Sequence, residues 1–176
     1  MKKQKAPKDW TNQIISLEEY CVAKNWNVEY TNKKRKEYDY FSGAENLIVI
    51  RRDRRPEITF YIMLHEIGHM MLCQNRNMYR ERYNAVFESF SKASLTHRVK
   101  TVEEELDAWK TGFKLAKRLK LYVNHRKFEQ VKARCITSYM VWAVNRKLIK
   151  EKESITNGSS TNITGGTDIN QSASKD

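Results

Sequence analysis

The most constraining feature of this chain is an apolar run that contains two histidines and one glutamate. The run reads FYIMLHEIGHMML and occupies residues 60–72. Because Pro56 suits the first turn of a helix, the sequence predicts a helix from Pro56 to about Gln74. That helix is apolar on nearly all sides, which predicts that it is buried. Histidine and glutamate side chains are costly to bury unless a partner satisfies their polar atoms.

The run contains the motif HExxH, formed by His65, Glu66 and His69. Residues four apart on a helix lie one above the other, so the two imidazoles can bind one metal ion. Glu66 lies beside that ion and is predicted to hold and deprotonate a metal-bound water, which is the general-base role in zinc-dependent peptide hydrolysis. The motif therefore predicts Zn²⁺ as cofactor. The alternative is a metal-free pair of hydrogen-bonded core histidines.

A catalytic zinc ion usually takes three protein ligands and keeps one position open. The segment VEEELDAW at residues 102–109 is the best source of the third ligand. Glu103 and Asp107 share one helix face, so Glu103 is predicted to bind the metal and Asp107 to orient a ligand histidine. Glu105 ranks second, and Glu104 ranks third because it also ends a predicted capping box, TVEE. The alternative is that these acids only stabilise the start of a helix.

Peptide hydrolysis also needs a hydrogen-bond donor for the oxyanion that develops in the transition state. Tyr79, Tyr83, His97 and His125 are candidates, and the sequence does not choose among them. The two histidines of this set are also rival third ligands.

The rest of the chain predicts an α+β fold, mainly helical, with a small sheet of two or three strands packed by the active-site helix. NVEYT at residues 27–31 and NLIVIRR at residues 46–52 are the predicted strands. Apart from the motif helix, helices are predicted over residues 16–24, 77–94, 101–116 and 128–150. Residues 1–150 are expected to form one domain. The polar segment 151–176 has no aromatic residue and is predicted to be a disordered tail.

Composition limits the classes of partner. The chain has 33 Lys and Arg against 21 Asp and Glu, a formal net charge of +12. This charge favours nonspecific nucleic-acid contact through a basic surface, or attraction of an acidic substrate; the alternative is a solvated surface without such a role. Three widely spaced cysteines argue against a disulfide framework. The sequence has neither a membrane-spanning apolar run nor a secretory signal, so we expect no membrane partner and a cytoplasmic location.

HEIGH followed by E-x-x-x-D-A-W resembles the gluzincin metallopeptidases. With the strand NLIVI and the arginine-rich turn before the motif, residues 16–119 resemble the ImmA/IrrE family and related phage-encoded metallopeptidases. The resemblance implies a zincin-like domain in which His65 and His69 bind zinc and Glu66 is catalytic. It also implies that Glu103 is the third ligand and Asp107 its acidic partner.

The resemblance further implies hydrolysis of a peptide bond in a protein substrate, such as a regulator of a phage or mobile element. The location would be the cytoplasm of the cell or host, or the virion if the protein is viral. A second hypothesis is a zinc-containing scaffold with little activity that binds DNA or a protein through its basic surface. The presence of Glu66 favours the enzyme, because a structural zinc site needs no acid beside the metal and prefers four closed ligands.

Overall fold

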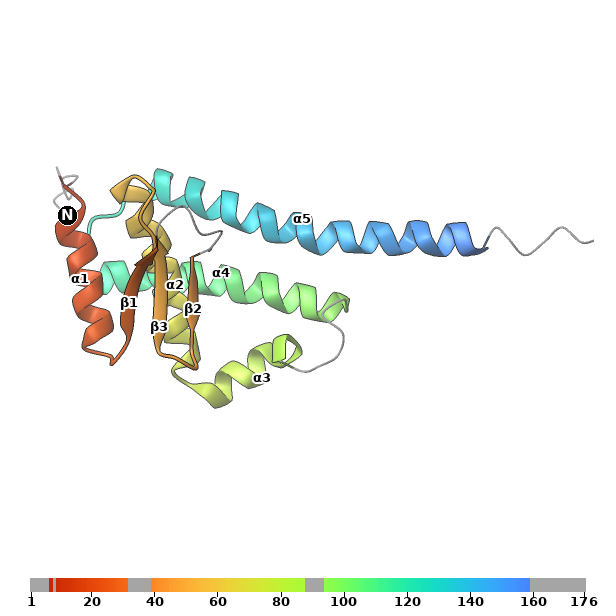
Figure 1. The fold of residues 1–176 in the computed structure, drawn as a ribbon, viewed down its shortest axis with the longest axis horizontal. Helices are drawn as coiled ribbons and strands as arrows, with labels where there is room; N and C mark the ends of the chain where they lie inside the picture. Colours follow the sequence, from red (N-terminus) through yellow and green to blue (C-terminus); the bar gives the residue numbers. More distant parts are fainter. Residues whose placement is uncertain (1–6, 8, 32–38, 88–93, 159–176) are drawn as a thin grey trace, which may run out of the picture.

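The computed structural model of the protein describes residues 7, 9–31, 39–87 and 94–158 (Figure 1). The elements in this part of the chain are α1 (Thr11–Val22), β1 (Asn27–Thr31), β2 (Tyr40–Ser42), β3 (Leu47–Arg51), α2 (Pro56–Cys73), α3 (Arg76–Phe87), α4 (Leu95–Arg118) and α5 (His125–Gly158). Helices dominate and the strands form one small sheet, so the predicted α+β class is confirmed. Among the described residues, no helix is long and apolar enough to cross a membrane.

The sheet has β3 at its centre, with β1 parallel on one side and β2 antiparallel on the other. Ile48, Val49 and Ile50 of β3 are all buried, and because successive side chains of a strand point to opposite faces, both faces are covered. Both predicted strands are present. The predicted sheet of two or three strands has three, but the position of the third strand, β2, was not predicted because three residues are too few to show an alternating pattern.

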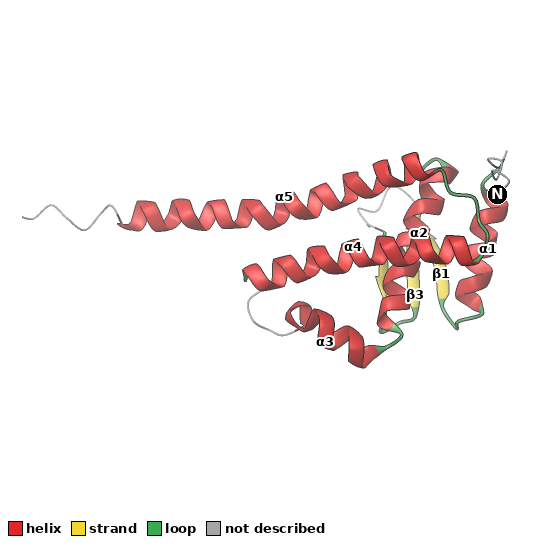
Figure 2. Cartoon of the chain, turned by 180° about the vertical axis from the view of Figure 1, so that it is seen from behind, coloured by secondary structure: helices red, strands yellow, loops and turns green. Residues whose placement is uncertain are grey.

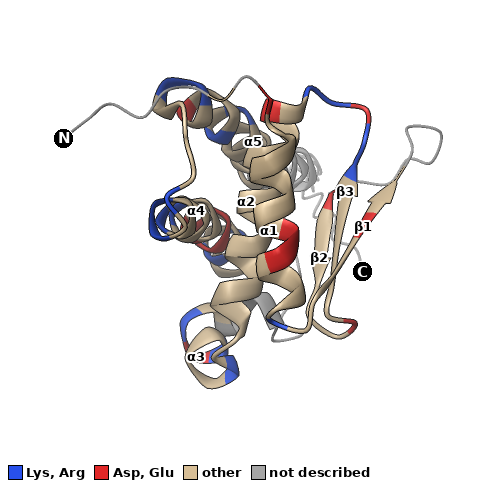
Figure 3. Cartoon of the chain, turned by 90° about the vertical axis from the view of Figure 1, so that its left-hand side faces the viewer, with Lys and Arg blue, Asp and Glu red and all other residues tan. Residues whose placement is uncertain are grey.

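The centre of the fold is α2, in which every side chain from Thr59 to Met70 is buried. The sheet lies on one side of α2 and α4 on the other (Figure 3). The helix begins at Pro56 and ends at Cys73, close to the predicted bounds. A helix that is apolar all round is stable only when other elements surround it, and this is the environment of α2.

The two helices α2 and α4 cross in direct backbone contact. A Cβ atom on Gly68 of α2 would lie 2.0 Å from the carbonyl oxygen of Ala108. A Cβ atom on Gly112 of α4 would lie 2.0 Å from the carbonyl oxygen of Leu64. Each glycine therefore permits an approach that no other residue allows. This approach brings α4 close to the histidines of α2.

Two helices begin earlier than the sequence predicts. Helix α1 begins before Ser16, whose hydroxyl donates to a carbonyl one turn back. Helix α4 begins after Ser94, which accepts a hydrogen bond from the amide of His97. Thr101 lies within α4 and donates to the carbonyl of His97. The predicted capping box TVEE and the predicted helix start at Ser16 are wrong, because Ser and Thr inside a helix can also bond to the preceding turn.

The last helix, α5, packs on the core near its start and then projects away from it (Figures 1 and 2). Phe128, Val131 and Ile136 are its buried contacts. The helix reaches Gly158, so the predicted boundary between residues 150 and 151 falls inside it. The rest of the predicted tail, residues 159–176, lies outside the described residues, as do residues 88–93 of the helix predicted over 77–94.

Candidate metal centre

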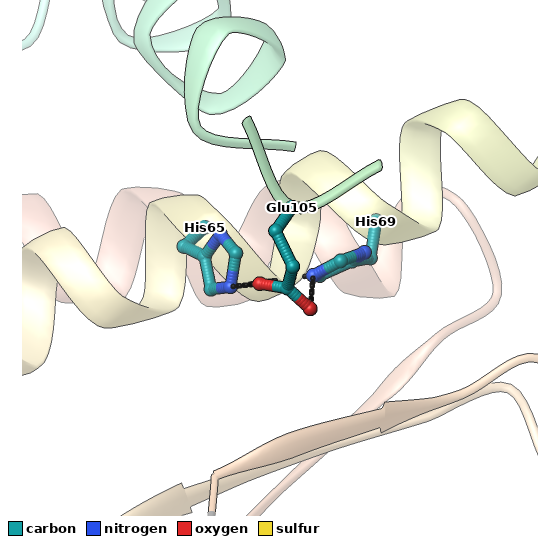
Figure 4. A group of neighbouring side chains, drawn as sticks. All are labelled: His65, His69 and Glu105. Carbon is teal, nitrogen blue, oxygen red and sulfur yellow. Dashed lines mark hydrogen bonds and ion pairs between the residues drawn. The ribbon is translucent and has the colours of Figure 1, made fainter. Parts of the chain in front are cut away.

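The structure brings His65 and His69 to one point on α2. Their Nε2 atoms lie 3.2 Å apart, and each residue is only 6 % exposed. Figure 4 shows both rings directed toward the same carboxylate, that of Glu105 on α4. The spacing of four residues predicts this convergence, because it places the two side chains on one helix face.

Glu105, and not Glu103, lies beside the two histidines. Its Oε2 is 3.1 Å from Nε2 of His65, and its Oε1 is 3.6 Å from Nε2 of His69. Ligand atoms of the three residues all lie within 4.8 Å of one another. The Glu103 side chain is 46 % exposed and forms an ion pair with Lys100. The prediction that ranked Glu103 first is corrected here in favour of Glu105, which it ranked second.

The packing of α4 explains this correction. Ala108, Trp109 and Gly112 are buried against α2, and with Glu105 they recur at the spacing i, i+3, i+4 and i+7 of one helix face. Glu103 lies off that face. A glycine within a helix is a signal of close packing, so Gly112 marks the Glu105 face rather than the face shared by Glu103 and Asp107.

A second carboxylate orients His69. Nδ1 of His69 donates to Oε1 of Glu104 at 3.2 Å, and the hydroxyl of Tyr79 donates to the same oxygen. Such a bond fixes the ring with Nε2 directed at Glu105. This role was predicted for Asp107, but Asp107 accepts from Tyr83 at 2.8 Å and pairs with Arg82. Glu104 therefore replaces Asp107 as the residue that orients a histidine.

Aromatic rings hold the two imidazoles in place. The ring of Trp109 stacks on His65, with centroids 4.5 Å apart and planes 16° apart. The ring of Phe41 stacks on His69, with centroids 5.5 Å apart and planes 5° apart. These contacts fix the orientation of both rings, which a pre-organised metal site requires.

The donor atoms fit a zinc ion, which accepts imidazole nitrogens and carboxylate oxygens. In the buried cluster, Nδ1 of His65 has no hydrogen-bond partner among the described residues. With Nδ1 of His69 bonded to Glu104, a proton on Nε2 makes the ring cationic and places a positive charge against the Glu105 carboxylate. A metal ion that displaced this proton would supply the positive charge in its place.

The pKa values of His69 and Glu105 are both shifted in the direction that favours the charged form of each group. Burial lowers the pKa of His69, but hydrogen bonds to Glu104 and Glu105 outweigh burial and raise it to about 10. Burial raises the pKa of Glu105, but hydrogen bonds from the two histidines outweigh it and lower it to about 2. A divalent cation would bind this anionic carboxylate and displace the proton from Nε2 of His69, because a ligand imidazole must be neutral.

Glu66 lies next to the cluster but is not part of the three-residue group. Its Oε1 is 4.0 Å from Nε2 of His65, and the residue is 6 % exposed. Burial raises the pKa of Glu66, against the opposing effect of the two imidazoles. A carboxylate at this position can accept a proton from a water molecule held between it and the cluster.

Sequence reasoning missed Tyr139 of α5. Burial, the charge of Glu105 and a hydrogen bond to Glu105 raise the pKa of its hydroxyl, which stays protonated as a hydrogen-bond donor. Of the predicted oxyanion donors, Tyr79 and Tyr83 donate to Glu104 and Asp107. The others, His97 and His125, pack against Trp142 and Phe113. The sequence offered no signal for Tyr139, because α5 is distant from the motif along the chain.

The orienting role of Glu104 gives a first prediction. We expect Glu104→Ala to weaken zinc affinity about 10- to 100-fold, because His69 loses the acceptor that fixes its proton on Nδ1. Competition with a chromogenic chelator measures this affinity. Glu103→Ala is the matched control, since it removes an exposed neighbour of the same charge. Equal affinities of the two variants would contradict the assignment of Glu104.

Comparisons of the chain with protein-family models, with curated proteins and with solved structures gave no match. The resemblance to ImmA/IrrE-like metallopeptidases therefore stays a prediction from the sequence motif. What the geometry defines is a buried cluster of two histidines and one glutamate, with a further glutamate beside it.

Proposed function

We propose that this protein is a zinc-dependent metallopeptidase that hydrolyses a peptide bond in a protein substrate. The position of Glu66 carries the proposal, because this buried acid lies beside a group of three ligand residues without belonging to it. A structural zinc site closes with four protein ligands and has no use for a neighbouring carboxylate. Three ligands and an adjacent acid are the arrangement of a hydrolytic site.

In this proposal His65, His69 and Glu105 hold the ion, and Glu104 fixes the proton of His69. A zinc ion at such a site supplies a Lewis acid, which polarises a carbonyl group and makes water more acidic. Glu66 accepts the proton of the attacking water and returns it to the leaving amine. Tyr139 is the candidate donor to the oxyanion, since its protonated hydroxyl already lies beside Glu105.

The substrate we propose is a protein inside the cell, in line with the resemblance to peptidases that cleave regulators. A cytoplasmic location is part of the proposal, and the unpaired cysteines Cys21, Cys73 and Cys135 are compatible with it. The comparisons name neither a substrate nor a partner.

The proposal predicts that Glu66→Gln keeps zinc but lowers cleavage about 10²- to 10⁴-fold, because the proton acceptor is lost while the ligands stay. Zinc content is measured by elemental analysis, and cleavage by mass spectrometry of a proteome-derived peptide library. His65→Ala is the companion variant, expected to lose both zinc and cleavage. Cleavage by Glu66→Gln at the wild-type rate would refute the catalytic role.

The second candidate function is a binding module for nucleic acid. Lys and Arg residues lie on the outer sides of α3 and α4 and along the connection between β3 and α2 (Figure 3). Under this hypothesis the protein shifts DNA in a salt-dependent manner, and Glu66→Gln shifts it equally well. DNA binding together with an absence of peptide cleavage by the wild type would favour this candidate.

A further inference from the structure

A cavity of about 440 Å³ lies next to the metal-site candidate, between the end of β2 and the start of α3. Phe41 and Gly43 form its wall on the sheet side. Arg76, Tyr79 and Arg80 form its wall on the helix side. The proposed function assigns no role to this cavity.

Two wall residues connect the cavity directly to the histidine cluster. Phe41 stacks on the ring of His69, and Tyr79 donates to Glu104, which accepts from His69. The cavity is therefore separated from His69 by a single layer of side chains. A peptide whose scissile bond lies at the cluster would place a neighbouring residue at this cavity.

The described charged residues that line the cavity are both basic. The seven described residues that line it include two arginines and no acid. Arg76 and Arg80 are one turn apart on α3, so they share a helix face, and both are exposed. The nearby Arg82 differs, because it pairs with Asp107. Two guanidinium groups beside an apolar aromatic wall are suited to bind a carboxylate, which an arginine can hold with two parallel hydrogen bonds.

We infer that this cavity is a substrate subsite that binds a carboxylate of the peptide next to the scissile bond. The inference rests on the proposed peptidase function. The carboxylate has two possible sources, an Asp or Glu side chain or the free C-terminus of the substrate. Both use the same chemistry, and the experiment distinguishes them.

The test exposes the zinc-loaded protein to a library of random peptides in two forms, with free and with amidated C-termini. We expect cleaved peptides to be enriched about tenfold in Asp or Glu at one fixed position near the cut, or to need the free C-terminus. Arg76→Glu and Arg80→Glu should each abolish this preference. Lys114→Glu on α4 is the matched control, because Lys114 is exposed and lies outside the cavity lining.

A binding measurement separates this inference from the proposed function. Immobilised Glu66→Gln protein, loaded with zinc, is used to capture peptides from the same library, which are identified by mass spectrometry. If captured peptides are enriched in carboxylates and Arg80→Glu abolishes this enrichment, the subsite is supported. If the wild type also cleaves nothing, only the peptidase proposal fails. Capture and cleavage without a carboxylate preference would overturn the subsite, and cleavage would still support the peptidase.

Discussion

Glu105→Ala is expected to reduce zinc affinity by more than about 100-fold, a larger loss than removal of an orienting residue causes. The carboxylate of Glu105 contacts both histidines of the cluster, at 3.1 Å and 3.6 Å. Without it, two imidazoles remain as protein ligands, and no negative charge from the cluster balances the cation. Zinc content after dialysis against a weak chelator, followed by a competition titration, measures the loss.

The three consecutive glutamates of α4 can be compared with one another in the same zinc-affinity measurement. We expect zinc affinity to fall most for Glu105→Ala, less for Glu104→Ala and not at all for Glu103→Ala. Glu105 contacts both histidines directly, and Glu104 contacts only Nδ1 of His69. Glu103 is exposed and pairs with Lys100. Circular dichroism of the metal-free variants checks that each one folds. A larger loss for Glu103→Ala than for Glu105→Ala would overturn the ligand assignment.

Gly112→Ala is expected to lower the free energy of unfolding by about 3 kcal/mol or more, at the upper end of overpacking substitutions. The new methyl group would lie 2.0 Å from the carbonyl oxygen of Leu64, and backbone cannot move aside as a side chain can. A thermal melt should show a midpoint lower by roughly 6–12 °C. Separation of α4 from α2 should also move Glu105 away from the histidines and weaken zinc binding.

Gly43→Ala is the control for this substitution. A Cβ at Gly43 would lie 3.4 Å from the ring of Phe41 and 3.6 Å from Sγ of Cys73, which is close to ordinary contact with side chains. We expect its unfolding free energy to change by less than about 1 kcal/mol. Equal melting temperatures of Gly112→Ala and Gly43→Ala would contradict the direct backbone contact between α2 and α4.

The sequence predicted the parts of this fold that depend on local pattern. The apolar run around His65 and His69 indicates a buried helix, and the β-branched residues of β3 indicate an interior strand, because each pattern reflects burial of that element alone. The convergence of the two imidazoles likewise depends only on helical spacing.

The remaining features depend on how separate elements meet. Which glutamate of α4 reaches the cluster is decided by the face that α4 turns toward α2, and Gly112 sets that face through a contact with a different helix. The start of α4 at Leu95, directly after Ser94, similarly brings His97 and Arg98 into buried positions, where Arg98 donates to the carbonyl of Ala143 on α5. Neither fact is encoded in the spacing of residues along α4 itself.

If zinc binds as proposed, the division of the cluster between α2 and α4 would couple metal loading to the folding equilibrium. An ion bound to both helices opposes their separation, so it stabilises the native state by an amount that grows with the free metal concentration. At a concentration 100 times the dissociation constant this stabilisation is about 2.7 kcal/mol. Cellular metal supply would then set the lifetime of the protein as well as its activity, since starvation for the ion would leave a chain that opens and is degraded more readily.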